Sequence, residues 1–143
     1  MTHPFRAAVE AGDIDAALAL LAEDVVFRSP VVFAPYQGRQ AVAPILHAFA
    51  RVAEDFRYVR EIGAPDASDH VLVFQARVGG RQLEGSDFLH AGADGLIDEL
   101  VVMVRPLSAA LALAEAMKAQ LAAALADGSP VNPGAAAGGR VLP

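Results

Sequence analysis

The feature that most constrains this chain is a pair of glycines, Gly79 and Gly80, set between two stretches rich in strand-forming residues. Adjacent glycines accept the positive φ angles that a two-residue hairpin turn requires. The flanking stretches, 71–78 and 81–89, are therefore predicted to form two antiparallel strands joined by a tight turn. Because the turn fixes the register, it also determines which residues of the two strands share a face.

One face of this hairpin is predicted to be almost entirely apolar. Side chains alternate between the two faces of a strand, and the inward set comprises Leu72, Phe74, Ala76, Leu83, Gly85, Asp87 and Leu89. Asp87 is the charged residue of this set, and the predicted register places it opposite Leu72. A buried charge without a partner is costly, so the position of a carboxyl group on this apolar face requires a specific cause.

Two interpretations of Asp87 are open from the sequence. In the functional one, apolar surroundings raise the pKa of its carboxyl group, which acts as an acid or as an oxyanion-type hydrogen-bond donor to a ligand. In the structural one, Asp87 pairs with an arginine or with backbone amides and contributes no chemistry. The first interpretation makes Asp87 the candidate catalytic residue.

The composition excludes several classes of function. The chain has 143 residues, no cysteine and a formal net charge of −6, which suggests one acidic domain without disulfides or thiolate metal sites. It has no basic stripe, so neither nucleic acid nor a membrane is an expected partner. Its histidines do not cluster with carboxylates at metal-ligand spacings, and we expect neither a metal nor another cofactor. Without a signal-peptide core or an uncharged apolar run of membrane-spanning length, a cytoplasmic location is expected.

The remaining segments predict helices before, between and after the strands along the sequence. The spacing of apolar residues predicts helices at 4–11, 14–21, 40–53 and 107–126, and strands at 25–28, 56–62, 71–78, 81–89 and 96–104. This order indicates an α+β domain in which three N-terminal helices pack on a curved antiparallel sheet. We expect that domain to span 1–106, followed by a C-terminal helix at 107–126 and an irregular tail at 127–143, rich in Gly, Ala and Pro.

A set of residues on these elements is predicted to line a pocket for a small apolar ligand. The candidates are Phe5, Ser29, Phe33, Tyr36, His47, His70, Leu72, Phe74, Leu83, Leu100 and Val102. His47 either reaches the pocket mouth as a base or lies at the surface. His70 either contacts a ligand at the pocket rim or makes a structural hydrogen bond. The loop that carries Phe33 and Tyr36 either covers the ligand or packs on the helix at 40–53.

Several short motifs, in this order, resemble those of one known superfamily. They are Ala11-Gly12-Asp13, Leu21-Ala22-Glu23-Asp24-Val25-Val26-Phe27, Gly38-Arg39 and Asp94-Gly95-Leu96-Ile97. Residues 5–106 are thereby similar to the SnoaL-like group of the nuclear-transport-factor-2-like superfamily, which includes ketosteroid isomerase and limonene epoxide hydrolase relatives. The resemblance implies a cone-shaped α+β barrel with a pocket. It is not specific for function, because this fold hosts many activities and non-enzymes.

The resemblance also relates four positions to known catalytic groups. Ketosteroid isomerase uses a base Asp together with a Tyr and a protonated Asp that hold the substrate oxygen. The protonated Asp stands eight positions before a turn glycine, as Asp87 does before Gly95. Phe5 stands where that enzyme has the Tyr, and Ser29 where it has the base. Val102 stands where epoxide hydrolase relatives carry an Asp, so the resemblance implies the pocket and Asp87 more than either named reaction.

The outward face of the hairpin carries Val71, Val73 and Phe88 at neighbouring positions. A contiguous apolar patch on a sheet exterior usually marks an interface. We therefore expect a two-fold homodimer through this face, which the resemblance also implies. The alternative is that the helix at 107–126 covers the patch.

Three functions are consistent with the sequence. The first is an acid/base enzyme of the isomerase, cyclase or hydratase type that acts on a small apolar carbonyl compound through Asp87. The second is a non-catalytic carrier or sensor of an apolar ligand. The third is a dimeric structural module.

Overall fold

The computed structural model describes residues 2–126, and the predicted irregular tail at 127–143 lies outside the described residues. The elements are α1 (Pro4–Glu10), α2 (Ile14–Ala19), β1 (Leu21–Arg28), β2 (Tyr36–Gln37), α3 (Arg39–Val52), β3 (Glu54–Ile62), β4 (Asp69–Val78), β5 (Arg81–Ala91), β6 (Ile97–Arg105) and α4 (Leu107–Ala126). Helices and strands follow the predicted order, with β2 as an additional short strand. The α+β fold class is therefore confirmed.

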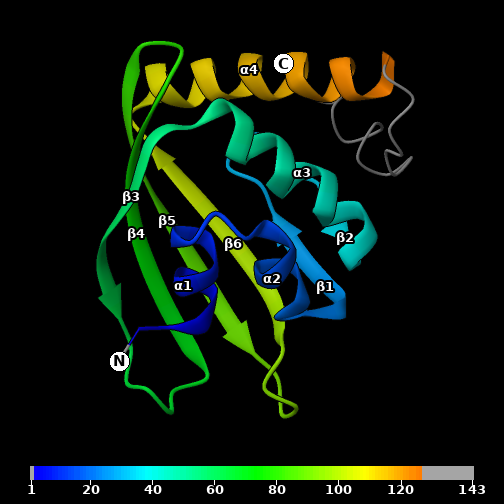
Figure 1. The fold of residues 1–143 in the computed structure, drawn as a ribbon, viewed down its shortest axis with the longest axis vertical. Helices are drawn as coiled ribbons and strands as arrows, with labels where there is room; N and C mark the ends of the chain where they lie inside the picture. The colour runs from blue at the N-terminus through cyan, green and yellow to red at the C-terminus, as the bar shows by residue number, and fades with distance from the viewer. Residues whose placement is uncertain (1, 127–143) are drawn as a thin grey trace.

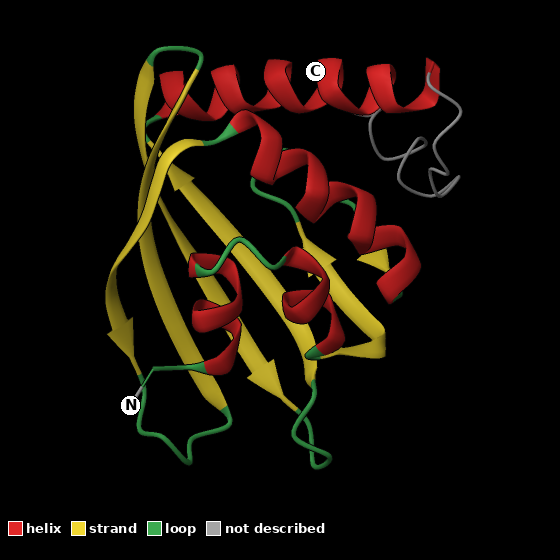
Figure 2. Cartoon of the chain, in the orientation of Figure 1, coloured by secondary structure: helices red, strands yellow, loops and turns green. Residues whose placement is uncertain are grey.

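The strands form one curved sheet in the order β2-β1-β6-β5-β4-β3. Neighbouring strands are antiparallel except for β1 and β6, which run parallel. Helices α1, α2 and α3 lie over one face of the sheet, and α4 crosses its end near the β4–β5 turn (Figure 1; Figure 2). The helix-covered face is the concave one, and the residues that form the hydrophobic core lie between the two layers.

The predicted register of the hairpin is confirmed. β4 pairs with β5 so that Phe74 faces Gly85 and Leu72 faces Asp87. The two turn glycines have φ angles of 57° and 77°, in the left-handed region that glycine enters without strain. Asp87 is one of two buried polar residues in the described chain, and it shares the concave face with its apolar neighbours.

Two local predictions at the start of the sheet are corrected by the structure. The helix predicted for 14–21 ends at Ala19, and Leu21 instead begins β1, where it pairs with Ile97. Leu21 is completely buried there, so tertiary packing overrides the helical spacing of its segment. The loop predicted after β1 contains β2, which pairs with β1 through Tyr36 and Phe27. Because β1 runs parallel to β6, the sheet is mixed rather than purely antiparallel.

The last helix, α4, packs against α3 and strands β4 to β6. Its buried residues are Ala109 and Leu113. By length and composition alone, α4 is apolar enough to cross a membrane, although little of it is buried. It carries two charged residues, Glu115 and Lys118. The helix is therefore not an uncharged apolar run of membrane-spanning length.

Candidate functional site

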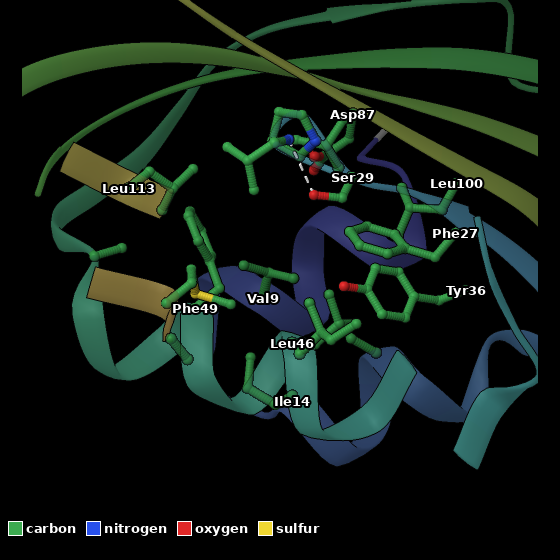
Figure 3. Close-up of a pocket in the computed structure, with 18 of the residues that line it drawn as sticks. Val9, Ile14, Phe27, Ser29, Tyr36, Leu46, Phe49, Asp87, Leu100 and Leu113 are labelled. Carbon is green, nitrogen blue, oxygen red and sulfur yellow. Dashed lines mark hydrogen bonds between the residues drawn. The ribbon is translucent and has the colours of Figure 1, made fainter. Parts of the chain in front are cut away.

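A cavity of about 760 Å³ lies between the concave face of the sheet and the helices. Every described helix and strand contributes side chains to its wall, which is mostly apolar (Figure 3). The polar side chains of the wall are Ser29, Tyr36, Tyr58, Asp87 and Lys118. Such a volume, with an apolar wall and a few polar groups, is typical of small-molecule sites.

Asp87 reaches this cavity from the middle of β5, where local sequence makes room for it. Gly85, two residues earlier on the same face, lies under the ring of Phe74 across the hairpin. A Cβ atom at position 85 would come within 2.2 Å of that ring, so only glycine lets Phe74 lie this close to β5. Phe74 and Asp87 thereby form adjacent parts of the cavity wall.

The protein partner of Asp87 is Tyr58. The Tyr58 hydroxyl donates a hydrogen bond of 2.9 Å to Oδ2 of Asp87. Tyr58 comes from β3, two strands away from β5 in the sheet, and is buried. Its ring meets the rings of Phe56 and Phe74 edge to face. This aromatic packing fixes the ring, and therefore aims the hydroxyl at the carboxyl group.

The surroundings of this pair set its protonation. Burial raises the pKa of the Asp87 carboxyl group to about 7, and the hydrogen bond from Tyr58 lowers the pKa by a smaller amount. Burial and the neighbouring Asp87 both raise the pKa of Tyr58. Tyr58 therefore keeps its proton, whereas Asp87 exchanges its proton near neutral pH. A carboxyl group of this kind is suited to acid/base catalysis.

Tyr58 is the candidate that sequence reasoning did not single out. A strand was predicted at 56–62, but its register against β4 was not fixed. The β3–β4 register shifts twice, between Glu54 and Arg57 and between Tyr58 and Arg60, which a count along the sequence cannot follow. The available signal was the aromatic pair Phe56 and Tyr58, because alternate positions of a strand share a face.

The structure places most of the predicted site residues in the cavity wall. These are Phe5, Ser29, Tyr36, Phe74, Asp87, Leu100 and Val102. They come from elements far apart in the sequence, and the curvature of the sheet brings them together. Their role in binding a ligand stays a prediction.

Three predicted apolar residues do not reach the wall. Leu72 and Leu83 are buried in the core and do not line the cavity. Phe33 is 100% exposed and points away from the cavity wall, to which its neighbour Val32 contributes instead. The aromatic loop therefore meets the cavity through Val32 and Tyr36 rather than through Phe33.

The two predicted histidines also lie outside the wall. Nε2 of His47 lies 3.1 Å from Oδ1 of Asp15 at the surface. His70 is buried, and its Nε2 lies 2.7 Å from the carbonyl oxygen of Ala64. Of its two predicted roles, ligand contact or structural hydrogen bond, this contact corresponds to the second. Within residues 2–126, no group of three or more His, Asp or Glu side chains is placed to hold a metal ion.

Known proteins share both the sequence pattern and the fold. The SnoaL-like domain family matches residues 3–100. A steroid delta-isomerase from Pseudomonas aeruginosa has 42% sequence identity and a TM-score of 0.79, over 84% of this chain and 88% of that chain. An uncharacterized protein with a cystatin-like fold from Silicibacter pomeroyi has 35% identity and a TM-score of 0.77, over 86% of this chain and 88% of that chain.

More distant structures share the fold alone. An NTF2-like protein of unknown function from Burkholderia xenovorans has 18% identity and a TM-score of 0.60, over 71% of this chain and 77% of that chain. Among curated proteins, none matches the chain significantly. The family match covers most of the chain, and the similar structures have the same curved sheet and helices. The resemblance inferred from short motifs is thus confirmed, and this chain belongs to the SnoaL-like domain family.

Proposed function

We propose that this chain binds a small apolar molecule in the cavity and activates an oxygen of that molecule through the acid form of Asp87. The observation that carries the proposal is one buried carboxyl group in an apolar wall, with its pKa raised to about 7. At that pKa, roughly half of the molecules hold the proton at neutral pH. The cavity of about 760 Å³ has room for a small multi-ring ligand.

The proposed chemistry is an isomerisation through an enolate. Protonated Asp87 donates a hydrogen bond to a carbonyl oxygen of the ligand. A C–H bond next to the carbonyl breaks, its electron pair moves toward the oxygen, and the proton passes to water. Asp87 stabilises the developing charge, because a donor in a water-poor site interacts most strongly with an anion. Return of a proton to a different carbon gives an isomer, with no net change in atoms.

Two features support this class of reaction. The chain is 42% identical to a steroid delta-isomerase over most of its length. Tyr58 places a hydroxyl beside Asp87 from β3, although Phe5 stands where the resemblance expects a tyrosine. Ser29 stands where the resemblance expects the aspartate base. Because a serine does not serve as that base, water is the proton acceptor in this scheme.

The pH dependence of turnover tests the proposal. A suitable substrate is a steroid ketone whose carbon–carbon double bond lies one bond away from conjugation, because the conjugated product is detected by its ultraviolet absorbance. If the acid form of Asp87 is active, kcat/KM falls as pH rises through about 7, because kcat/KM reports the groups of the ligand-free protein. A kcat/KM that rises through the same range would assign the activity to the carboxylate as a base. A profile without a transition near neutral pH would contradict a role for Asp87.

A second candidate function is binding without catalysis. It is favoured by the observation that Asp87 is the one carboxyl group in the described cavity wall, so no second carboxylate stands ready to take a proton. Titration with a non-reactive steroid ketone separates the two functions. Binding without turnover of the unconjugated ketone would favour a carrier or sensor.

We also propose that the chain forms a two-fold homodimer through the convex face of the sheet. Phe88 is 37% exposed and Met103 is 57% exposed on that face, and Phe88 lies between its strand partners Val71 and Val101. Helix α4 packs on the cavity side and leaves these residues uncovered. Light scattering should therefore give the mass of a dimer, and Phe88→Glu should give a monomer. A monomeric wild type would contradict the dimer, and a dimeric Phe88→Glu would place the interface elsewhere.

A cytoplasmic location is likewise a proposal. It is supported by the packing of α4, whose Leu113, Met117 and Leu121 line the cavity of the domain. Cell fractionation tests it, and recovery of the chain with membranes after a high-salt wash would contradict it.

A further inference from the structure

The hydroxyl of Tyr36 is an unused polar group in the cavity wall. Tyr36 is 7% exposed, and its hydroxyl makes no hydrogen bond to any residue in 2–126. Two other hydroxyls of the wall have protein partners: Ser29 Oγ accepts from the amide of Val31 at 3.1 Å, and Tyr58 donates to Asp87. Figure 3 shows the Tyr36 hydroxyl directed into the cavity.

No hydrogen bond within residues 2–126 explains why position 36 carries a hydroxyl group. Within the described chain, no fully buried side-chain nitrogen or oxygen lacks a hydrogen-bond partner, so the Tyr36 hydroxyl is open to the cavity rather than sealed in the core. Burial alone raises the pKa of Tyr36, as expected for a hydroxyl without a protein partner. The ring itself is fixed, because β2 pairs Tyr36 with Phe27 and the two rings lie 6.1 Å apart. A phenylalanine would pack equally well, so the hydroxyl is available for a ligand.

Tyr36 and Asp87 enter the cavity from different strands. The paired residues Tyr36, Phe27, Leu100 and Leu89 form one row across four strands, and Asp87 is two residues from Leu89 along β5. The protein partner of Asp87 is Tyr58 rather than Tyr36. The Tyr36 hydroxyl and the Asp87 carboxyl group are therefore separate polar positions in one wall.

We propose that the Tyr36 hydroxyl is a second polar subsite, which binds a second oxygen of a ligand whose first oxygen lies at Asp87. This inference rests on the proposed function for the position of the first oxygen. The ligand class is then a rigid, mostly apolar carbon skeleton with two oxygen functions. The apolar residues between the two subsites, Phe27 and Leu100 among them, contact the skeleton.

The test compares matched ligands that differ by one oxygen. Calorimetric titration uses three pairs of probes: a decalone and a decalindione, a tricyclic monoketone and its diketone, and a steroid monoketone and the diketone with its second carbonyl on the far ring. In at least one pair, the diketone should bind the wild type about three- to tenfold more tightly, the value of one neutral hydrogen bond. Tyr36→Phe should remove this preference and leave the affinity for the monoketone unchanged.

Two measurements make the outcome decisive. Thermal unfolding of Tyr36→Phe should match that of the wild type, because no internal hydrogen bond is lost. Ser29→Ala, which removes a different neutral hydroxyl of the wall, should keep the preference for the diketone. Equal affinities within every pair, the absence of binding by all six probes, or a preference that survives in Tyr36→Phe would overturn the second subsite.

The same titrations separate this inference from the proposed function. Loss of the preference in Tyr36→Phe, together with no turnover in the wild type, would retain the subsite and remove the acid catalysis. Turnover that depends on Asp87, together with an unchanged preference in Tyr36→Phe, would retain the acid catalysis and remove the subsite.

Discussion

Asp87 and His70 are the two buried polar residues of the described chain, at 7% and 8% exposure, and they lie on the same face of adjacent strands. His70 is held by the carbonyl oxygen of Ala64 and by the ring of His3 at 4.8 Å. Asp87 has one hydrogen bond, from Tyr58, and otherwise faces an apolar cavity.

The difference makes Asp87, rather than His70, the candidate site residue. His70 fills its site completely: a Cβ atom on Gly63 would lie 2.6 Å from its ring, at a position where φ is 126°. Asp87 keeps part of its hydrogen-bonding capacity free, and the cost of its burial appears as a raised pKa. Burial alone therefore does not make a polar residue a candidate for a site, whereas burial in the wall of a cavity does.

The largest expected effect is on turnover. Asp87→Asn keeps the shape of the side chain but replaces the acidic O–H by an amide N–H, a much weaker hydrogen-bond donor to a developing oxyanion, so kcat should fall by about 100- to 1,000-fold. His70→Gln is the matched control, since it changes the other buried polar residue and should leave kcat within about twofold. Full turnover in Asp87→Asn, or an equal loss in His70→Gln, would break the distinction between the two residues.

The next effect is on stability and has a defined sign. The pKa of Asp87 is about 7 in the folded chain and 3.8 in the reference state, so the folded state binds more protons between these pH values. Stability should therefore fall as pH rises from about 4 to 7, by roughly 4 kcal/mol if no other group compensates. Asp87→Asn should lack this loss and be the more stable protein at pH 8. Denaturant unfolding at several pH values measures the free energy of unfolding of both proteins. If this free energy changed with pH in the same way in both, the raised pKa would be contradicted.

His70→Ala should act in the opposite direction. It removes a buried ring and leaves the carbonyl oxygen of Ala64 without its partner, so the free energy of unfolding should fall by about 1–3 kcal/mol. Ligand affinity should not change, because His70 lies outside the cavity wall. Urea denaturation and calorimetric titration of the same variant check both parts. A large loss of affinity in a folded His70→Ala variant would restore His70 as a site residue.

The smallest effect concerns Tyr58. Its hydrogen bond lowers the pKa of Asp87, so Tyr58→Phe should raise that pKa further. The reason is that the hydrogen bond from Tyr58 favours the charged form of the carboxyl group. The fall of kcat/KM with pH should then move to higher pH. An unchanged pH profile would mean that Tyr58 only packs against Asp87.

The sequence predicted those parts of the site that depend on local rules. A two-glycine turn fixes one register, and that register placed Asp87 on the concave face opposite Leu72. The position of Tyr58 depends on two shifts in the β3–β4 register, which no local rule supplies. Phe33 and Tyr36 belong to one loop and share an aromatic character, yet only Tyr36 reaches the cavity, because the short strand β2 holds its backbone.

Asp87 is expected to titrate near neutral pH because it is buried beside an apolar cavity. Nuclear magnetic resonance of the full chain with isotope-labelled aspartate carboxyl groups measures this titration directly, and Asp87→Asn assigns the signal. We expect one aspartate signal that titrates with a pKa of about 7 and is missing in the variant. An Asp87 signal that titrates near the ordinary value of about 4 would contradict it.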